Sequence, residues 1–419
     1  MRHFTSDERL LIVFKRKEAG LTVNQLSKQI HMSKSNLSRI ENDKIMVSKE
    51  NEEILEKRYG IDFTLGATTV EAVDVLIDYL VKLLVFYRLF DDYTREELDR
   101  EYDKVHNSIA YPYYMLIKLF IYTVKSVDKK FTVKYMKIFD SLIDQFAFKY
   151  QKIYYVSKMH YLYSMKEYQH ALKVTEFIES RYSPDDILDS YLYHFKATIY
   201  SCLGEQDKVI ETLDKAIELT KITNNSVRKL ALQITRANRI RLQGKYLDAL
   251  KYDITSYEFA QQENVHIYDY ALLRNIAWTY YLMGDYENAI KRYKIAEELD
   301  IDDDLCFIMA YCYFKLAMDC ESPSQKLDLR IQCKEYLNKG RKAKNSGIAF
   351  PYLIDWLELM LYKKYSVKAE QKLLYCLKKY ETTMHVDSRN NIYKFLIEHY
   401  EYHQDSKNAD YYRKKLQNG

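Results

Sequence analysis

Glycine and proline are scarce in this chain of 419 residues, which contains nine Gly and four Pro. An average soluble protein spends about 7% of its residues on glycine and about 5% on proline. Sandwiches and barrels of β-strands need frequent tight turns, and those turns depend on Gly, Asn-Gly and Pro. The scarcity therefore excludes such folds and predicts long helices joined by short polar loops.

Long apolar runs and paired cysteines are missing too. The nearest approach to a membrane span, residues 70–90, carries five charged side chains, whereas a spanning helix needs about 18 or more apolar residues. The six cysteines form no Cys-x-x-Cys pair, and the first residues do not resemble a signal peptide. We expect a cytoplasmic protein with reduced thiols in a helical core and no contact with a membrane.

The sequence also lacks a convergent catalytic set. It has no glycine-rich phosphate loop and no metal-type cluster of Cys and His. His399 and His403 lie four residues apart on a predicted helix, but a third ligand is not evident, and solvated helix residues are the default interpretation. We therefore expect no metal, no cofactor and no enzymatic activity.

Positive charge is concentrated at the N-terminus, although the whole chain is nearly balanced. The 64 Lys and Arg residues face 60 Asp and Glu residues, which argues neither for nor against nucleic acid. Residues 1–49, in contrast, contain ten basic and five acidic residues. Binding to DNA phosphates requires such local charge, so we expect the DNA contact there.

Capping signals divide the first sixty residues into four short helices. Thr5 and Thr22 each precede a Glu or Gln by three residues, which is the spacing of a capping box. Ser33 caps a third predicted helix over 34–42, and a fourth begins near Ser48. The second and third helices are separated by a tight turn, and the third has a polar, basic outer face. This is a helix-turn-helix arrangement, whose second helix fits the major groove of DNA.

The second and third helices resemble those of the Cro/CI-type (XRE) helix-turn-helix family. The likeness is carried by Gly20-Leu21-Thr22, by Gln25-Leu26-Ser27 and by the run from Ser33 to Asn42. The forked guanidinium of Arg39 can contact guanine through two hydrogen bonds. The predicted DNA-binding residues are Thr22, Ser33, Lys34, Ser35, Asn36, Ser38, Arg39 and Lys44.

Other positions match the family or depart from it. Arg16 and Glu41 match a pair that ties the first helix to the end of the third. Val23 stands where the family usually has a phosphate-contacting Gln, and Asp43 stands where Gly is usual. Asp43 would place a carboxylate near the DNA backbone. A polar surface helix without a DNA role remains the alternative for 33–42.

A period of 40 residues appears in the second half of the chain. Gly204, Gly244 and Gly284 are spaced by 40 residues, and each separates two predicted helices. The unit around Gly284 is close to the tetratricopeptide pattern, in which small residues let antiparallel helices approach and repetition builds a continuous core.

We therefore expect an all-α chain with two parts. The predicted domains are a helix-turn-helix domain over 1–60, a linker over 61–69, and a right-handed superhelix of antiparallel, tetratricopeptide-like helix pairs over 70–419. Within the last part we expect one helix over 131–149 and two final helix pairs over 351–380 and 390–417.

The first helix of each tetratricopeptide pair lines a concave face, and this resemblance indicates where a peptide would bind. An Asn amide can pair with both the N–H and the C=O of a passing backbone, and an Arg can meet a carboxylate. The predicted peptide-binding residues are His194, Asn238, Arg241, Arg274, Asn275, Trp278, Tyr281 and Tyr311. Surface ion pairs for the arginines and a core position for Trp278 remain open as alternatives.

A Cro/CI-type domain followed by such repeats resembles the peptide-responsive regulators of Gram-positive bacteria, the Rgg, PlcR, NprR and PrgX group, which is related to the Rap proteins. The resemblance implies a cytoplasmic homodimer that binds a two-fold operator and a short signalling peptide, as in quorum sensing. Two alternatives stay open: a repeat domain that binds or sequesters a protein partner, and a peptide-independent dimeric repressor.

Overall fold

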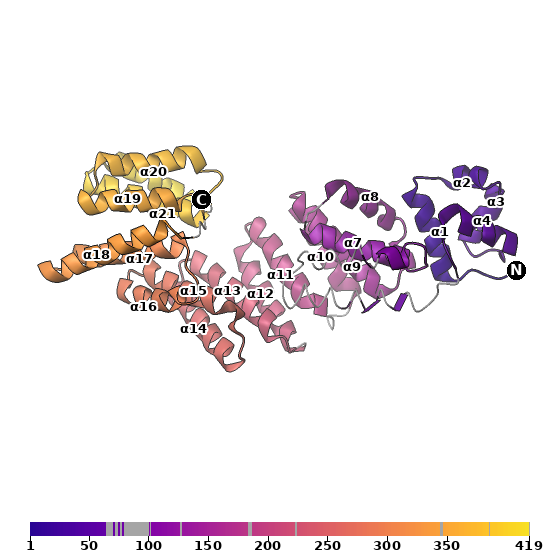
Figure 1. The fold of residues 1–419 in the computed structure, drawn as a ribbon, viewed down its shortest axis with the longest axis horizontal. Coiled ribbons are helices and arrows are strands. Elements are labelled where there is room, and N and C mark those ends of the chain that lie inside the picture. The colour runs from indigo at the N-terminus through magenta and orange to yellow at the C-terminus, as the bar shows by residue number, and fades with distance from the viewer. Residues whose placement is uncertain are drawn as a thin grey trace. The chain divides into compact units, whose positions relative to one another are not determined.

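The computed structural model is helical over almost all of the chain that it describes, which confirms the predicted all-α class (Figure 1). It forms two compact units, Met1–Leu232 and Gln233–Gly419. The predicted linker lies mostly outside the described residues, so the domain boundaries at 60 and 70 stay a prediction. The described residues are 1–63, 70–71, 74–75, 78, 100, 102–125, 128–182, 187–222, 224–343, 347–384 and 386–418.

Four capped helices form the N-terminal head, by which we mean residues 1–63. They are α1 (Ser6–Glu18), α2 (Val23–Gln29), α3 (Lys34–Glu41) and α4 (Lys49–Tyr59). The side chains of Thr5, Thr22, Ser33 and Ser48 each accept a hydrogen bond from a backbone N–H in the first turn, as the sequence predicts. Such caps satisfy backbone groups that have no partner inside the helix.

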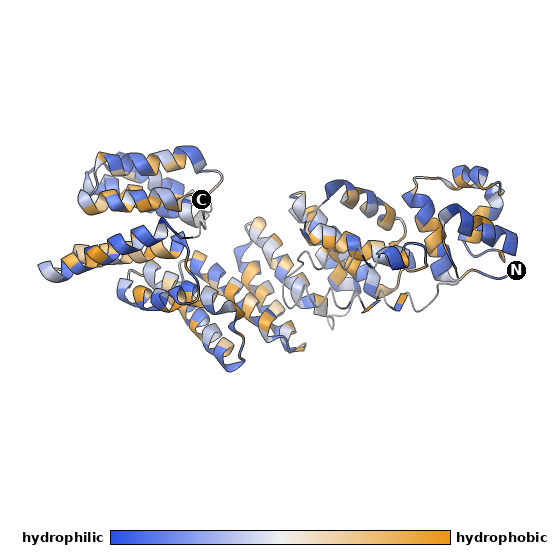
Figure 2. Cartoon of the chain, in the orientation of Figure 1, coloured by the Kyte–Doolittle hydropathy of each residue, from blue (hydrophilic) through white to orange (hydrophobic). Residues whose placement is uncertain are grey.

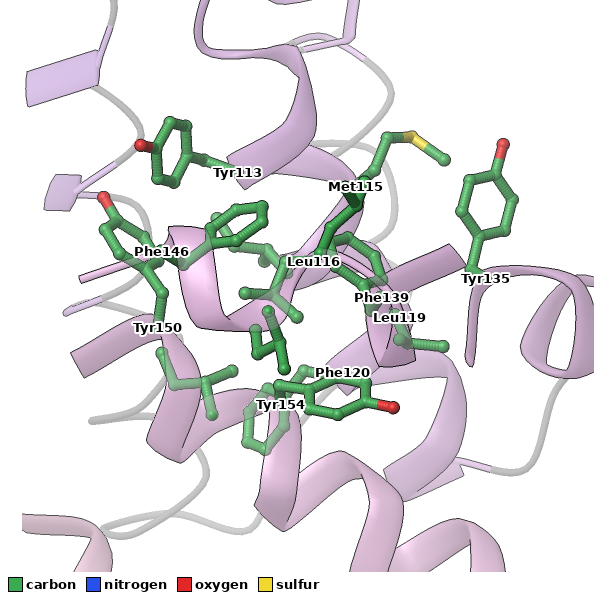
Figure 3. Packing of buried hydrophobic residues seen from close by; sticks show 14 of the residues in the cluster. Tyr113, Met115, Leu116, Leu119, Phe120, Tyr135, Phe139, Phe146, Tyr150 and Tyr154 are labelled. Atoms are coloured by element: carbon green, nitrogen blue, oxygen red, sulfur yellow. The ribbon is translucent and has the colours of Figure 1, made fainter. Parts of the chain in front are cut away.

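The first unit continues with further helices. They are α7 (Tyr111–Lys125), α8 (Lys129–Asp140), α9 (Phe148–Ser164), α10 (Tyr168–Arg181), α11 (Ile187–Cys202) and α12 (Gln206–Ile222), followed by α13 (Ser226–Leu242), within which the division between the units falls. Helix α7 packs on both α8 and α9, and the aromatic rings of these three helices meet in the buried cluster of Figure 3.

The expectation of one helix over 131–149 is wrong. The chain leaves the helix after Asp140, makes a short 3₁₀ turn over Ile143–Gln145 and starts α9 at Phe148. The break lets Phe146 enter the core, where its ring lies 5.1 Å from that of Tyr113 (Figure 3). Burial of this aromatic side chain overrides the helical pattern of the sequence.

The second unit consists of helices that pair with their neighbours. They are α14 (Tyr246–Gln262), α15 (Asp269–Leu282), α16 (Tyr286–Glu297), α17 (Asp303–Asp319), α18 (Pro323–Gly340), α19 (Phe350–Tyr362), α20 (Val367–Tyr380), α21 (Val386–Tyr402) and α22 (Ser406–Asn418). The last four confirm the two predicted C-terminal pairs. Figure 2 shows hydrophobic and hydrophilic residues on the same helices, as expected for helices that bury one face. None of the described helices is long and apolar enough to cross a membrane.

The turns repeat with the predicted period of 40 residues. Gly204, Gly244 and Gly284 close the turns inside successive pairs and have φ angles of 79°, 75° and 78°. Asn224 and Asn264, also 40 residues apart, close the turns between pairs with φ angles of 50° and 54°. This left-handed backbone conformation suits Gly, and Asn tolerates it better than most residues. The asparagine turns are a second marker of the repeat.

We predict that Gly244→Ala destabilises the chain by about 1–2 kcal/mol, because an L-residue with a Cβ atom is strained in the left-handed conformation. An added Cβ atom would meet no other atom within 4 Å, so a steric clash cannot account for the loss. Gly244→Asn is the matched control and should lose less. Urea denaturation measures both variants, and equal stability of the Ala variant and the parent would contradict the prediction.

Candidate functional sites

The outer face of α3 presents the residues that the sequence assigns to DNA. Ser33, Lys34, Ser35 and Arg39 are exposed, and Asn36 and Ser38 are half-buried. The inner face is buried through Leu37 and Ile40. Thr22 and Lys44 are exposed on either side of α3 in the chain, Thr22 as the cap of α2. The predicted DNA-binding residues therefore lie at the surface of one small helical domain.

Acidic residues of the head form ion pairs with arginines that lie behind this face. Arg16 donates from Nε and Nη2 to the two carboxylate oxygens of Glu41, at 2.7 and 2.8 Å. This buried pair confirms the predicted tie between the first and third helices. Arg2 donates to Glu8 at 2.8 Å near the N-terminus. Removing either partner of a buried pair leaves an uncompensated charge, so the pair fixes the helices relative to one another.

Asp43 shows why the family favours glycine at its position. Its backbone is left-handed, with a φ angle of 57°. Its carboxylate lies 3.0 Å from Nη1 of Arg9 and 3.0 Å from Nδ1 of His3. The carboxylate that the sequence places near DNA is thus held by cationic and polar partners from the N-terminal segment of the head.

Four further cations of the head are available to an anion. The structure shows no hydrogen bond or ion pair between the side chains of Lys28, Lys34, Arg39 or Lys44 and any residue that it describes. All four side chains are exposed. Unpaired cations on the outer surface match the requirement of a phosphate backbone.

The other side of the head packs against the first helices of the repeats. The ring of Phe14 on α1 lies 5.7 Å from that of Tyr111 and 5.5 Å from that of Phe139. The carboxylate of Glu18 accepts hydrogen bonds from the hydroxyl groups of Tyr111, at 2.7 Å, and Tyr135. The head is therefore anchored on α7 and α8 through α1.

Two further polar contacts strengthen this anchor. The ammonium group of Lys15 donates to the backbone carbonyl of His106 at 3.0 Å and lies 3.7 Å from the ring centre of Tyr111. Burial lowers the pKa of Lys15. The hydroxyl group of Tyr113 donates to Asp7 at 2.6 Å. Sequence patterns gave no sign of these partners, because roughly ninety or more residues separate them in the chain.

In the second unit, a hydrogen-bonded chain links two predicted peptide-binding residues. Arg241 donates to the side-chain oxygen of Asn238 within α13. Its Nε donates to the hydroxyl group of Thr279 on α15 at 2.8 Å, and that hydroxyl group donates to the backbone carbonyl of Asn275. The side-chain amide of Asn275 is half-buried and has no hydrogen-bond partner among the described residues. Arg241 thus holds the side-chain amide of Asn238 directly, and it reaches only the backbone of Asn275, through Thr279.

The predicted arginines form ion pairs within the protein. Arg241 is buried and pairs with Asp253, whose side chain is fully buried. Burial raises the pKa of Asp253 to about 7, although Arg241 opposes this shift. Arg274 pairs with Asp302 at 3.2 Å and with Asp304. Both arginines thus form ion pairs, as in the alternative left open by the sequence, although the pair of Arg241 is buried rather than at the surface. A contact between either arginine and a peptide stays a prediction.

The predicted aromatic residues form a stack that continues toward the C-terminus. Trp278, half-buried, stacks on Tyr281 with ring centres 4.9 Å apart, and Tyr281 meets Tyr311 edge-on at 5.7 Å. Tyr281 and Tyr311 are buried, and burial raises the pKa of both well above the ordinary value. The hydroxyl group of Tyr311 faces Glu398 at 3.5 Å, a residue that sequence reasoning missed. Only Trp278 leaves part of its ring at the surface in this group.

The remaining sequence-based candidates are three histidines. His194 belongs to the first unit, where its Nδ1 lies 2.9 Å from Nη2 of the buried Arg228. His399 is buried with its Nε2 3.6 Å from Glu370, and His403 faces the carbonyl of Tyr365. In the part of the chain that the structure describes, no three His, Cys, Asp or Glu residues are grouped to hold a metal ion.

Comparisons with known proteins match both parts of the chain. A family model described as helix-turn-helix matches residues 14–65. A curated relative, the transcriptional activator NprA of Geobacillus stearothermophilus, is 24% identical over 282 residues, which cover 63% of this chain. The match spans 65% of that relative, slightly under two thirds of its length.

Two solved structures share the fold. The apo form of RapI superposes with a TM-score of 0.64 at 15% identity, over 84% of this chain and 98% of RapI. The apo form of the quorum sensor NprR from B. thuringiensis gives a TM-score of 0.56 at 18% identity, over 83% of this chain and 98% of NprR. The chain combines a helix-turn-helix domain with the repeat fold of these proteins, which confirms the predicted resemblance to the Rap and NprR group.

We predict that Arg39→Ala reduces the difference in binding free energy between a preferred duplex and a scrambled one by about 1–3 kcal/mol, because two hydrogen bonds to one base edge are lost. The preferred duplex is first selected from a random pool with the parent protein. Fluorescence anisotropy measures both affinities. Lys57→Ala removes an exposed cation of α4 as the control. If both variants discriminate equally well, Arg39 does not read bases.

We predict that Arg241→Met and Asp253→Leu each destabilise the chain by about 3–5 kcal/mol, because each leaves one buried charge without its partner. The double variant Arg241→Met/Asp253→Leu should lose much less, because no charge is then left unpaired. Urea denaturation provides the three values. An Arg241→Met variant as stable as the parent would show that Arg241 does not hold α13 and α14 together.

Proposed function

We propose that the protein is a sequence-specific DNA-binding transcription regulator controlled by a short signalling peptide, which its repeats bind. The observation that carries the DNA-binding step is the outer face of α3, where Lys34 and Arg39 are exposed and have no ion pair among the described residues. The match to a helix-turn-helix family model over residues 14–65 supports the same step.

The peptide-binding step is supported by the amides on α13 and α15. The free amide of Asn275 can donate to a carbonyl and accept from an N–H of an extended peptide, whatever the peptide's side chains are. Arg241 holds the Asn238 amide by its oxygen, which leaves that amide's N–H groups to donate. The half-buried ring of Trp278 supplies apolar surface on the same helix as Asn275.

Regulation requires that the peptide bind one conformation of the repeats better than another, because a ligand with equal affinity for both shifts nothing. The anchored α1 offers a route to the DNA. Because α1 packs on α7 and α8 through Phe14 and Glu18, a change in these helices moves the head with them. We propose a cytoplasmic homodimer on a two-fold operator, so that the spacing of the two heads determines which half-sites are bound.

We predict that peptides encoded by a neighbouring small open reading frame shift both the thermal unfolding and the affinity of the protein for a selected duplex. Asn275→Ala should weaken peptide binding at least several-fold, because peptide backbone groups lose their partner on desolvation. Asn338→Ala, an exposed asparagine on α18, is the matched control. Isothermal titration calorimetry measures peptide binding directly.

The outcome also distinguishes peptide control from a peptide-independent repressor. Peptide control would be contradicted if saturating peptide changed neither the thermal unfolding nor the affinity for the duplex, and if the Asn275→Ala variant behaved like the parent. DNA binding that persists in that case would favour a peptide-independent repressor.

A further inference from the structure

Helix α8, which lies outside the helix-turn-helix domain, exposes a group of lysines. Lys129 and Lys130 form its first turn, and Lys134 follows on the same face, because residues four apart lie above one another on a helix. All three side chains are exposed, and none has an ion pair among the residues that the structure describes. We call these three residues the α8 lysine group.

The acidic side chains of α8 and the one at the end of α1, which the structure describes, have other partners. The carboxylate of Asp128 accepts from the backbone N–H of Phe131 and caps the helix. Glu18 accepts from the hydroxyl groups of two tyrosines. Asp140, at the opposite end of α8, pairs with Lys158 at 2.6 Å. The lysines therefore keep their charge for an external anion.

The contacts between α1 and α8 fix the direction in which the lysine group projects. Tyr135 meets Glu18 at the end of α1, whereas Phe139, one turn later in α8, meets Phe14, one turn earlier in α1. The two helices therefore run antiparallel. Going from Tyr135 back to Lys130 adds about 7.5 Å of helix, at about 1.5 Å per residue. The lysine group thus lies beyond the C-terminal end of α1.

The end of α1 leads into α2, the helix that lies toward the DNA backbone. Only residues 19–22 separate them. In a bound helix-turn-helix the first helix of the pair crosses the sugar-phosphate backbone, while the second enters the major groove. Here α2 begins with Val23, an apolar side chain that cannot contact a phosphate. The α8 lysine group projects beyond the end of α1 from which the chain enters α2.

We propose that the α8 lysine group is a second phosphate-contacting site for double-stranded DNA, outside the helix-turn-helix domain. It binds the backbone next to the stretch covered by α2 and α3, and it contributes affinity without reading sequence. The inference rests on the proposed DNA-binding function. It also gives the anchor of α1 a role, because the anchor holds the lysine group and the recognition helix in a fixed relation.

The test compares Lys129→Gln/Lys130→Gln/Lys134→Gln with the parent in the full chain. The probe is a random-sequence 40-base-pair duplex, and the observable is the slope of log Kobs against log salt. Each lost phosphate contact should lower the magnitude of the slope by about 0.9, so three contacts lower it by about 2.7. The corresponding triple Arg variant keeps the charge and should keep the slope.

A matched control removes three exposed lysines elsewhere, Lys173→Gln/Lys251→Gln/Lys294→Gln. It changes the net charge by the same amount and should leave the slope near that of the parent. Thermal unfolding of every variant checks that the fold is intact. An equal loss of slope in both triple variants, or no loss in the α8 variant, would overturn the proposal.

A third variant separates this inference from the proposed function. Lys34→Gln/Arg39→Gln removes cations of α3 only. If it weakens binding while the α8 variant does not, the helix-turn-helix binds DNA and the α8 site is refuted. If neither variant changes binding, the proposed DNA-binding function itself fails.

Discussion

The packing of α1 on both of its sides is the constraint on which the head depends. Five consecutive residues of this helix, Leu10 to Phe14, are all at most 7% exposed. An amphipathic helix at a surface buries one stripe, whereas a helix that is apolar all round has neighbours on every side. One side of α1 faces the helix-turn-helix and the other faces α7 and α8. Helix α3, which packs on α1, is thereby held against the repeats by side-chain packing rather than only by the covalent chain.

Polar contacts make this packing specific. Apolar surfaces alone would tolerate a rotation or a slip, but the carboxylate of Glu18 must lie where both Tyr111 and Tyr135 can donate to it. Hydrogen bonds to a charged group contribute about 1.5–3 kcal/mol, and leaving such a group buried without partners costs more. A shift of the head would break these contacts together. A conformational change in α7 or α8 is therefore transmitted to α3 as a movement of the whole head.

Local signals in the sequence were sufficient to predict most helices and the helical head, whereas contacts between residues far apart in the chain were not predictable. The capping residues and the 40-residue glycine period act within a few residues, so helix starts and turns could be predicted. The run of apolar residues in α1 indicates a second interface, but no sequence pattern identified Tyr111 or Tyr135 as its partners. The break at Phe146 depends on a core that assembles from three helices. Arg241 was predicted to bind a peptide because the tetratricopeptide resemblance places it on the concave face. No sequence pattern identified Asp253, twelve residues later, as its buried partner.

Whether a charge already has a partner separates the cations that fix helices within this chain from the cations that are available to a ligand. Arg16 and Arg241 are buried and hydrogen-bonded to carboxylates, so they fix one helix against another. Arg39 and Lys134 are exposed and have no such partner among the described residues, so their charge is available to an external anion. Sequence alone does not distinguish these classes, because both contain the same residue types. The near-neutral net charge of the chain therefore conceals two separate populations of cations, and only the unpaired ones are free to bind an external anion.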